Sequence, residues 1–85
     1  MQQWKIFQVL DKNHELKEVP QKRLDRLYTI VRAETGFPAL FNSTDGGALV
    51  TSFVEEYRYG DGTLTITTEN SIYKFQTCDE EGNWC

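Results

Sequence analysis

The chain has 85 residues and a mass of 9.9 kDa, enough for one domain with one modest core and too little for a second domain. Its 39% hydrophobic and 13% aromatic content is typical of a folded globule and excludes a disordered chain. No stretch approaches the ~20 apolar residues of a membrane-spanning helix. The chain also starts without the pattern of a secretory signal peptide, so we expect a cytoplasmic protein that does not bind membranes.

The net charge of −4 is unevenly distributed along the chain. Residues 1–32 hold seven basic and four acidic side chains, a net charge of +3, whereas residues 33–85 hold two basic and nine acidic ones, a net charge of −7. Acidic surface can keep a small protein in solution, or it can dock on a basic surface of a protein partner. Direct binding to nucleic acid is disfavoured, because that affinity depends on neutralising phosphates with basic side chains.

The pattern of residues predicts an α+β fold in which a single amphipathic helix packs on a curled antiparallel sheet of about four to five strands, in the order β(β)αβββ. We expect residues 1–85 to form one domain, with residues 79–85 as a mobile acidic tail. The first strand spans residues 4–10, which are rich in β-branched and aromatic residues. A polar turn follows at residues 11–14, and then a short second strand over residues 15–19.

The helix is predicted over residues 20–35. Leu24, Leu27, Tyr28 and Val31 stand at positions i, i+3, i+4 and i+7, the spacing of one helix face. Pro20 suits the first helical turn, and Gly36 suits the position just after the last one.

After the predicted helix the pattern becomes that of β-hairpins. Asp61-Gly62 is a strong signal for a two-residue hairpin loop, because both positions need a positive φ. This loop pairs Tyr59 with Leu64 and residue 57 with residue 66. A second hairpin, around residues 69–70, pairs residue 66 with 73 and 64 with 75. These registers place six side chains on one face that we expect to meet the helix: Tyr57, Tyr59, Leu64, Ile66, Tyr73 and Phe75.

Further back along the same strand the alternation would place Glu55 on the core face, where an unpaired carboxylate is costly. A β-bulge at Glu55-Glu56 would shift the alternation by one residue and bring Val54 inward instead. We therefore predict a bulge at these two residues.

Few residues in the sequence carry chemistry. His14 is the one histidine, and it lies in a predicted polar turn with no nucleophile near it in sequence. Cys78 and Cys85 would supply, together with His14, at most three of the four ligands of a zinc site. We expect both thiols to be free, and the alternative is a disulfide between them that closes a small acidic loop. The sequence thus predicts no enzyme, no cofactor and no metal site.

In size, acidity and lack of a catalytic set, the chain is similar to the short acidic proteins of phages and mobile elements, of which anti-CRISPR and other host-defence inhibitors are examples. This resemblance implies an inhibitor that occupies a basic surface of a nucleic-acid-handling protein. We expect five residues on or beside the hairpins to contact the partner: Glu55, Glu56, Arg58, Asp61 and Glu69.

Two other functions fit the same sequence. The chain could be a structural or assembly protein that associates with itself, through a sheet edge or through its oppositely charged ends. It could also be a small regulator that touches nucleic acid through the basic residues of the predicted helix, which are Lys22, Arg23, Arg26 and Arg32. The sequence leaves the oligomeric state open.

Overall fold

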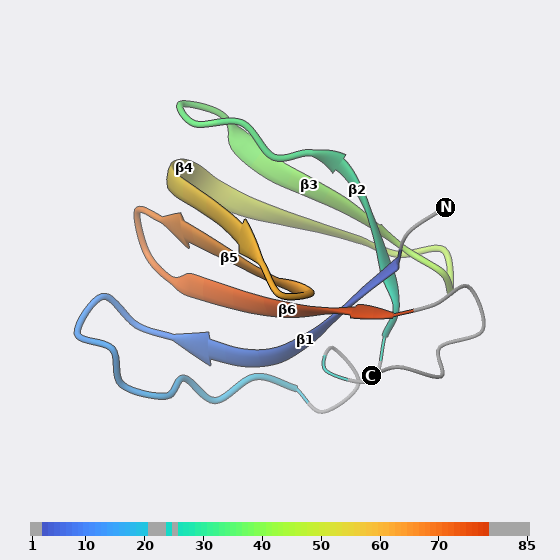
Figure 1. Cartoon of the computed structure of the whole chain (residues 1–85), viewed down its shortest axis with the longest axis horizontal. Coiled ribbons are helices and arrows are strands. Elements are labelled where there is room, and N and C mark those ends of the chain that lie inside the picture. Colours follow the sequence, from blue (N-terminus) through green and yellow to red (C-terminus); the bar gives the residue numbers. More distant parts are fainter. Residues whose placement is uncertain (1–2, 21–23, 25, 79–85) are drawn as a thin grey trace.

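The computed structural model describes residues 3–20, 24 and 26–78, and in this part of the chain every regular element is a strand (Figure 1). The six strands are β1 (Gln3–Leu10), β2 (Tyr28–Arg32), β3 (Pro38–Ser43), β4 (Ala48–Gly60), β5 (Thr63–Thr68) and β6 (Ile72–Cys78). Each strand pairs antiparallel with the next one in sequence. Because β6 also pairs antiparallel with β1, the sheet closes into a barrel.

The predicted α+β fold is therefore wrong, since the second half of the expected helix is strand β2. The run of residues 28–31 is aromatic and β-branched, and such side chains lose less rotamer freedom in a strand than in a helix. Tyr28 and Ile30 both face the core, which is the period-two pattern of a strand. Val31, which the helix would have buried, is half exposed. Residues 21–23 and 25 of the expected helix lie outside the described residues.

The beginning of the chain folds largely as the sequence predicts. Strand β1 confirms the expected first strand, and a turn follows it in which the Asp11 carboxylate accepts hydrogen bonds from the backbone amides of Asn13 and Glu15. The expected short strand over residues 15–19 does not form. Its place is taken by an isolated bridge between Leu10 and Leu16.

Strand β3 has no counterpart in the sequence prediction, which assigned no element to residues 38–43. Its first residue is Pro38, a position where the missing amide costs no ladder hydrogen bond. Gly36, expected to end a helix, instead has a φ of +90° in the connection between β2 and β3.

Both predicted hairpins and their registers are confirmed. The pairs of β4 with β5 include Tyr59 with Leu64 and Tyr57 with Ile66, and those of β5 with β6 include Ile66 with Tyr73 and Leu64 with Phe75. Asp61 and Gly62 have φ values of +52° and +75°, the left-handed conformations that a type I′ loop requires.

The bulge in β4 is confirmed as well. The register with β5 shifts between Val54, which pairs with Thr68, and Glu56, which pairs with Thr67. Glu55 is the extra residue. As a result Val54 is buried in the core and both neighbouring carboxylates remain outside it.

The core fills the inside of the barrel and receives side chains from all six strands. Its centre holds three rings: Tyr28 lies edge-on to Phe41 and Phe75, with ring centroids 6.3 and 6.4 Å away, and Phe41 lies 4.7 Å from Phe75. Leu64 and Ile66 of β5 are fully buried beside them. Four side chains of the predicted face thus belong to this core, and among the described residues no helix covers them: Leu64, Ile66, Tyr73 and Phe75.

Two of those six side chains are not buried. Tyr57 is 46% exposed and Tyr59 is 56% exposed, although each is paired with a fully buried residue of β5. The reason lies in β4, which pairs with β3 as far as Phe53 and with β5 from Val54 onward. Beyond Val54 no described strand flanks β4 on its other side, so both rings stay accessible, although the Tyr59 ring lies edge-on to Trp4 with centroids 5.7 Å apart.

The described residues test three further expectations only in part or not at all. The acidic tail at residues 79–85 and Cys85 lie outside the described residues, so the tail's mobility and the state of the two thiols stay predictions. Nowhere in residues 3–20, 24 and 26–78 is there a helix with the length and apolar character that crossing a membrane requires.

Candidate interaction surface on β4, β5 and β6

Strand β5 separates a buried face from an accessible one by simple alternation. Leu64, Ile66 and Thr68 point into the barrel and are fully buried. Thr65 and Thr67 lie on the other face and are partly exposed. The same alternation puts Glu56 and Arg58 of β4 on this outer face, because they pair with Thr67 and Thr65. Lys74 of β6 joins them as the partner of Thr65 on the opposite side.

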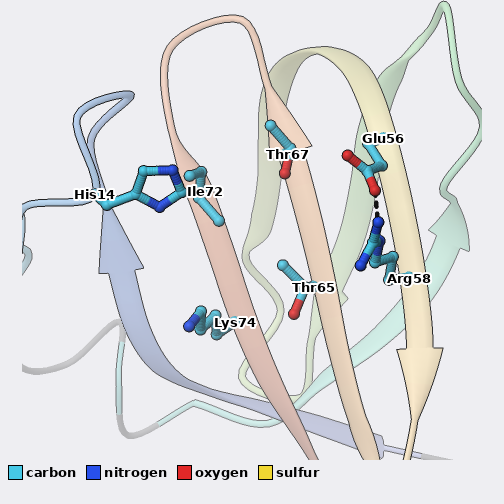
Figure 2. A pocket seen from close by; sticks show the side chains of 7 residues that line it. All are labelled: His14, Glu56, Arg58, Thr65, Thr67, Ile72 and Lys74. Atoms are coloured by element: carbon cyan, nitrogen blue, oxygen red, sulfur yellow. Dashed lines mark hydrogen bonds and ion pairs between the residues drawn. The ribbon is translucent and has the colours of Figure 1, made fainter.

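These side chains surround a shallow hollow of about 310 Å³ on the outside of the barrel (Figure 2). Its floor is the pair Thr65 and Thr67, with Glu56 and Arg58 on the β4 side and Lys74 and Ile72 on the β6 side. His14 closes one corner from the turn after β1, where its own φ of +64° helps to reverse the chain. We call these seven residues the outer hollow.

Charge in the outer hollow is mixed. The Arg58 guanidinium donates a hydrogen bond to the carboxylate of Glu56, two residues earlier on the same face of β4. Lys74 has no acidic partner among the described residues, and the Arg58 side chain is 80% exposed despite its ion pair. The hollow therefore offers two cations, two hydroxyl groups and one already paired carboxylate to whatever binds there.

The five residues predicted to contact a partner do not converge on one spot. Glu56 and Arg58 line the outer hollow. Asp61 lies in the turn between β4 and β5, whereas Glu69 lies in the turn between β5 and β6, at the other end of the six-residue strand β5. Six residues of strand span roughly 20 Å, so the two turn carboxylates lie at opposite ends of the face.

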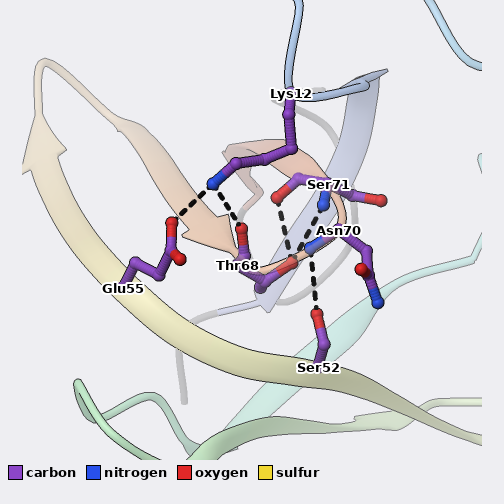
Figure 3. Close-up of polar contacts among 6 residues, drawn as sticks. All are labelled: Lys12, Ser52, Glu55, Thr68, Asn70 and Ser71. Carbon is purple, nitrogen blue, oxygen red and sulfur yellow. Dashed lines mark hydrogen bonds and ion pairs between the residues drawn. The ribbon is translucent and has the colours of Figure 1, made fainter.

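Glu55, the fifth predicted contact residue, belongs to a polar cluster at one end of the barrel (Figure 3). Its carboxylate forms an ion pair with Lys12, and the Lys12 ammonium also donates to the carbonyl oxygen of Thr68 at 3.0 Å. The buried Thr68 hydroxyl donates to the carbonyl oxygen of Ser71 at 3.0 Å and accepts the Ser71 amide at 3.1 Å. This cluster fixes the turn between β5 and β6 and leaves Glu55 already paired.

Folding therefore mixes the charges that the sequence separates. Lys12 pairs with Glu55, and Arg26 pairs with Asp45 at 2.9 Å, so basic side chains of the first part lie against acidic ones of the second. Arg32 lies 4.5 Å above the ring of Phe37, an arrangement typical of a cation–π contact. No helix carries the predicted basic surface in residues 26–35: Arg26 is engaged with Asp45, and Arg32 lies in strand β2. Lys22 and Arg23 lie outside the described residues.

The surroundings of the Asp45 carboxylate lower its pKa. It accepts hydrogen bonds from the Ser43 hydroxyl and the Gly47 amide, and it faces the Arg26 guanidinium. These contacts, the Ser43 hydrogen bond foremost, hold the pKa of Asp45 below its ordinary value of 3.8. The group closes the loop between β3 and β4 and lies away from the outer hollow.

The described residues hold no cluster of potential metal ligands. No group of three or more potential metal ligands gathers in residues 3–20, 24 and 26–78. In the same part of the chain the His14 ring makes no hydrogen bond to a carboxylate or hydroxyl group, and its corner of the hollow is open to solvent.

Sequence reasoning missed five members of the outer hollow: His14, Thr65, Thr67, Ile72 and Lys74. The signal was present for four of them, because the confirmed registers place Thr65, Thr67, Ile72 and Lys74 on the face opposite Leu64 and Ile66. His14 could not have been placed, since only the folded chain brings the turn after β1 to this face.

Comparison with family models, with curated proteins and with solved structures gives no match to this chain. The resemblance to phage-encoded inhibitors of host defence therefore finds no support.

Proposed function

We propose that this chain is a small non-enzymatic binding protein that engages a protein partner through the outer face of β4, β5 and β6. The observation that carries the proposal is the outer hollow, an accessible polar depression on a paired sheet with the exposed Arg58 at its side. Enclosed, mostly apolar cavities are typical of small-molecule sites, whereas an open polar depression is better matched by a protruding side chain of another protein.

The residue types around the hollow favour binding energy over simple solubility. Arg58 lines the hollow, and arginine is among the residues most often found where interfaces gain their affinity. Its side chain is 80% exposed. Because Arg58 lies on a strand fixed by its pairing with β5, little backbone freedom is lost when a partner binds.

The partner we propose has a basic surface. Asp61 and Glu69 have no ion-pair partner among the described residues, whereas Glu55 and Glu56 are paired with Lys12 and Arg58. A basic partner would therefore meet the two turn carboxylates first. Charges at the rim of an interface act mainly on the association rate, and their effect decreases as salt rises. A cytoplasmic location remains a prediction, which fractionation of the source cells would test.

The experiment compares three immobilised baits in lysate of the source cells: the unaltered chain, Thr65→Arg and Thr29→Arg. Thr65→Arg fills the outer hollow with a large side chain. Thr29→Arg makes the same exchange on β2, outside the hollow, and is the matched control. We expect at least one protein to be retained by the unaltered chain and by Thr29→Arg, and to be lost from Thr65→Arg. Equal retention by all three baits, or retention of nothing above the resin alone, would contradict the proposal.

With the purified partner, the second measurement is the association rate of charge-reversed variants at low and high salt. Asp61→Lys and Glu69→Lys should slow association at low salt, and the difference should shrink at high salt. Reversal of the acidic residues 79–81 should have less effect, as should Glu55→Lys, because the Glu55 carboxylate is already neutralised by Lys12. A larger effect at Glu55 than at both turn residues would exclude this charge assignment.

A further inference from the structure

The last residues of β4 form an edge that the described part of the chain leaves open. At Val54 the side of the strand away from β5 is still occupied: the Val54 amide donates to the carbonyl oxygen of Phe37, and the Val54 carbonyl oxygen accepts the Gly36 amide, both at 2.9 Å. After Val54, Glu55 is the extra residue of the bulge and residues 56–60 pair with β5 alone. All six are exposed, and a Cβ placed on Gly60 would meet no atom within 4 Å.

The register of the hairpin shows which backbone groups point to this open edge. In the loop between β4 and β5, Gly60 and Thr63 are the first and fourth residues of the turn, which makes them a hydrogen-bonded pair. Such pairs alternate along an antiparallel ladder, so Arg58 and Glu56 also direct their amides and carbonyls toward β5. The amides and carbonyls of Tyr57 and Tyr59 therefore point the other way, toward the open edge.

We infer that this edge binds the same edge of a second copy, in an antiparallel arrangement with a two-fold axis at Tyr57. In this register Tyr57 forms a hydrogen-bonded pair with Tyr57 of the other copy. Glu56 of each copy then stands directly opposite Arg58 of the other, in a pair without backbone hydrogen bonds, where side chains lie closest. The two-fold axis generates this contact twice, so the strand sequence is complementary to itself.

Alternative registers lack this complementarity. Backbone alternation allows the axis to move only in whole residues along the edge. An axis at Arg58 opposes two arginines, and an axis at Tyr59 opposes Arg58 to Gly60, which offers no charge. Charged side chains at an edge normally prevent pairing with unrelated strands. Here the same two side chains exclude strands of other sequence and accept a second copy.

This inference does not depend on the proposed function, because it concerns the edge of β4 and not the outer hollow as a binding site for another protein.

The short edge implies a weak dimer, since interfaces well below about 1,200 Å² are typical of transient association. Sedimentation equilibrium of the unaltered chain, from about 10 μM to about 1 mM, is the first measurement. We expect the mass to rise from 9.9 kDa toward twice that value. A mass that stays at 9.9 kDa up to about 1 mM would overturn the inference and leave the proposed function untouched.

Two charge variants test the register. Glu56→Arg and Arg58→Glu each oppose like charges twice across the axis and should each weaken self-association by roughly tenfold or more. Mixed in equal amounts, the two variants regain both opposite-charge contacts between copies, although each chain has lost its own ion pair of residues 56 and 58. The mixture should therefore associate more strongly than either variant alone, and no gain on mixing would exclude the register.

Lys74→Glu is the matched control, with the same change of charge as Arg58→Glu two strands away from the edge. It should leave self-association unchanged, and a loss equal to that of Arg58→Glu would refute pairing at β4.

Amide hydrogen exchange tests the same pairing without any substitution. The Tyr57 and Tyr59 amides should become protected as the concentration rises, whereas the Glu56 and Arg58 amides should be protected at every concentration. Protection of Tyr57 and Tyr59 that is independent of concentration would also contradict the inference.

Discussion

The ammonium group of Lys12 lies between the carboxylate of Glu55 and the carbonyl oxygen of Thr68, which joins the turn after β1 to the bulge of β4 across 43 positions of sequence. Glu55 is the residue that the bulge pushes out of the core. The bulge thus keeps the Glu55 carboxylate out of the apolar interior, and Lys12 neutralises that carboxylate at the surface.

A double-mutant cycle with Lys12→Met and Glu55→Gln should give a coupling free energy of about 0.2–1 kcal/mol, because both side chains are about half exposed and their attraction is screened. Lys12→Met should cost more than Glu55→Gln, since it also removes the hydrogen bond to Thr68. Urea unfolding of the four proteins at low salt measures the coupling. A coupling indistinguishable from zero would mean that the pair contributes nothing to stability.

Substitution of a buried and of an exposed leucine tests where the stabilising core lies. Leu64→Ala should lower the free energy of unfolding by about 2–5 kcal/mol, because Leu64 is fully buried in the barrel and its loss leaves a cavity. Leu16→Ala makes the same change at a side chain that is 72% exposed, and should cost less than about 0.5 kcal/mol. Urea unfolding gives both values. Equal losses at the two positions would show that the inside of the barrel is not the stabilising core.

Two glycines lie at the hairpin between β4 and β5, and replacing Gly62 should destabilise the protein whereas replacing Gly60 should not. Gly62→Ala forces an alanine into a φ of +75° and should cost about 1–2 kcal/mol. The added Cβ would lie 3.7 Å from the Thr77 hydroxyl, an ordinary contact, so the cost is conformational. Gly60→Ala, in open space with no positive φ, should leave stability unchanged or raise it slightly. Thermal unfolding of both variants tests this order, and its reversal would rule out the type I′ loop.

Asp45 should make stability depend on pH in the acid range. Its folded pKa is depressed, so the carboxylate stabilises the fold above the ordinary value of 3.8, and this contribution is lost as the pH falls through the lower folded pKa. The stability difference between the unaltered chain and Asp45→Asn should therefore be largest near pH 7 and shrink below pH 3.8. Urea titrations across this range measure it.

Asp61→Asn is the control for this pH series, because the Asp61 carboxylate has no hydrogen-bond or ion-pair partner among the described residues. Its difference from the unaltered chain should stay small throughout. A difference for Asp45→Asn that does not change with pH would mean that the contacts with Ser43 and Gly47 do not favour the charged form.

The hairpins could be predicted because their determinants are local. Asp61-Gly62 defines the loop, the alternation of Leu64 and Ile66 defines the face, and the cost of burying Glu55 defines the bulge. Each of these arguments needs information from fewer than about 15 residues of sequence, a span over which pairing is fixed by turn geometry.

The segment before β3 could not be predicted in the same way. Leu24, Leu27, Tyr28 and Val31 fit the spacing of a helix, and residues 28–31 fit a strand equally well. The choice depends on partners that are distant in sequence: Tyr28 pairs with Trp4 on one side and with Ser43 on the other. Periodicity contains no information about such pairing. The same limit applies to the outer hollow, where His14 arrives from another part of the chain.

The pairing of β1 with β6 has a consequence for the time at which the protein can fold. Its ladder runs from Gln3 with Cys78 to Leu10 with Ile72, so the earliest of the six strands to be synthesised must wait for the latest one. Until then β1 keeps Ile6 and Val9, both buried in the finished barrel, exposed to other chains. The barrel therefore closes only after β6 has been synthesised, because this long-range pairing cannot form one element at a time. Nascent chains arrested before residue 72 has emerged should accordingly be digested by protease as readily as unfolded chain, and resistance at that length would contradict this order of events.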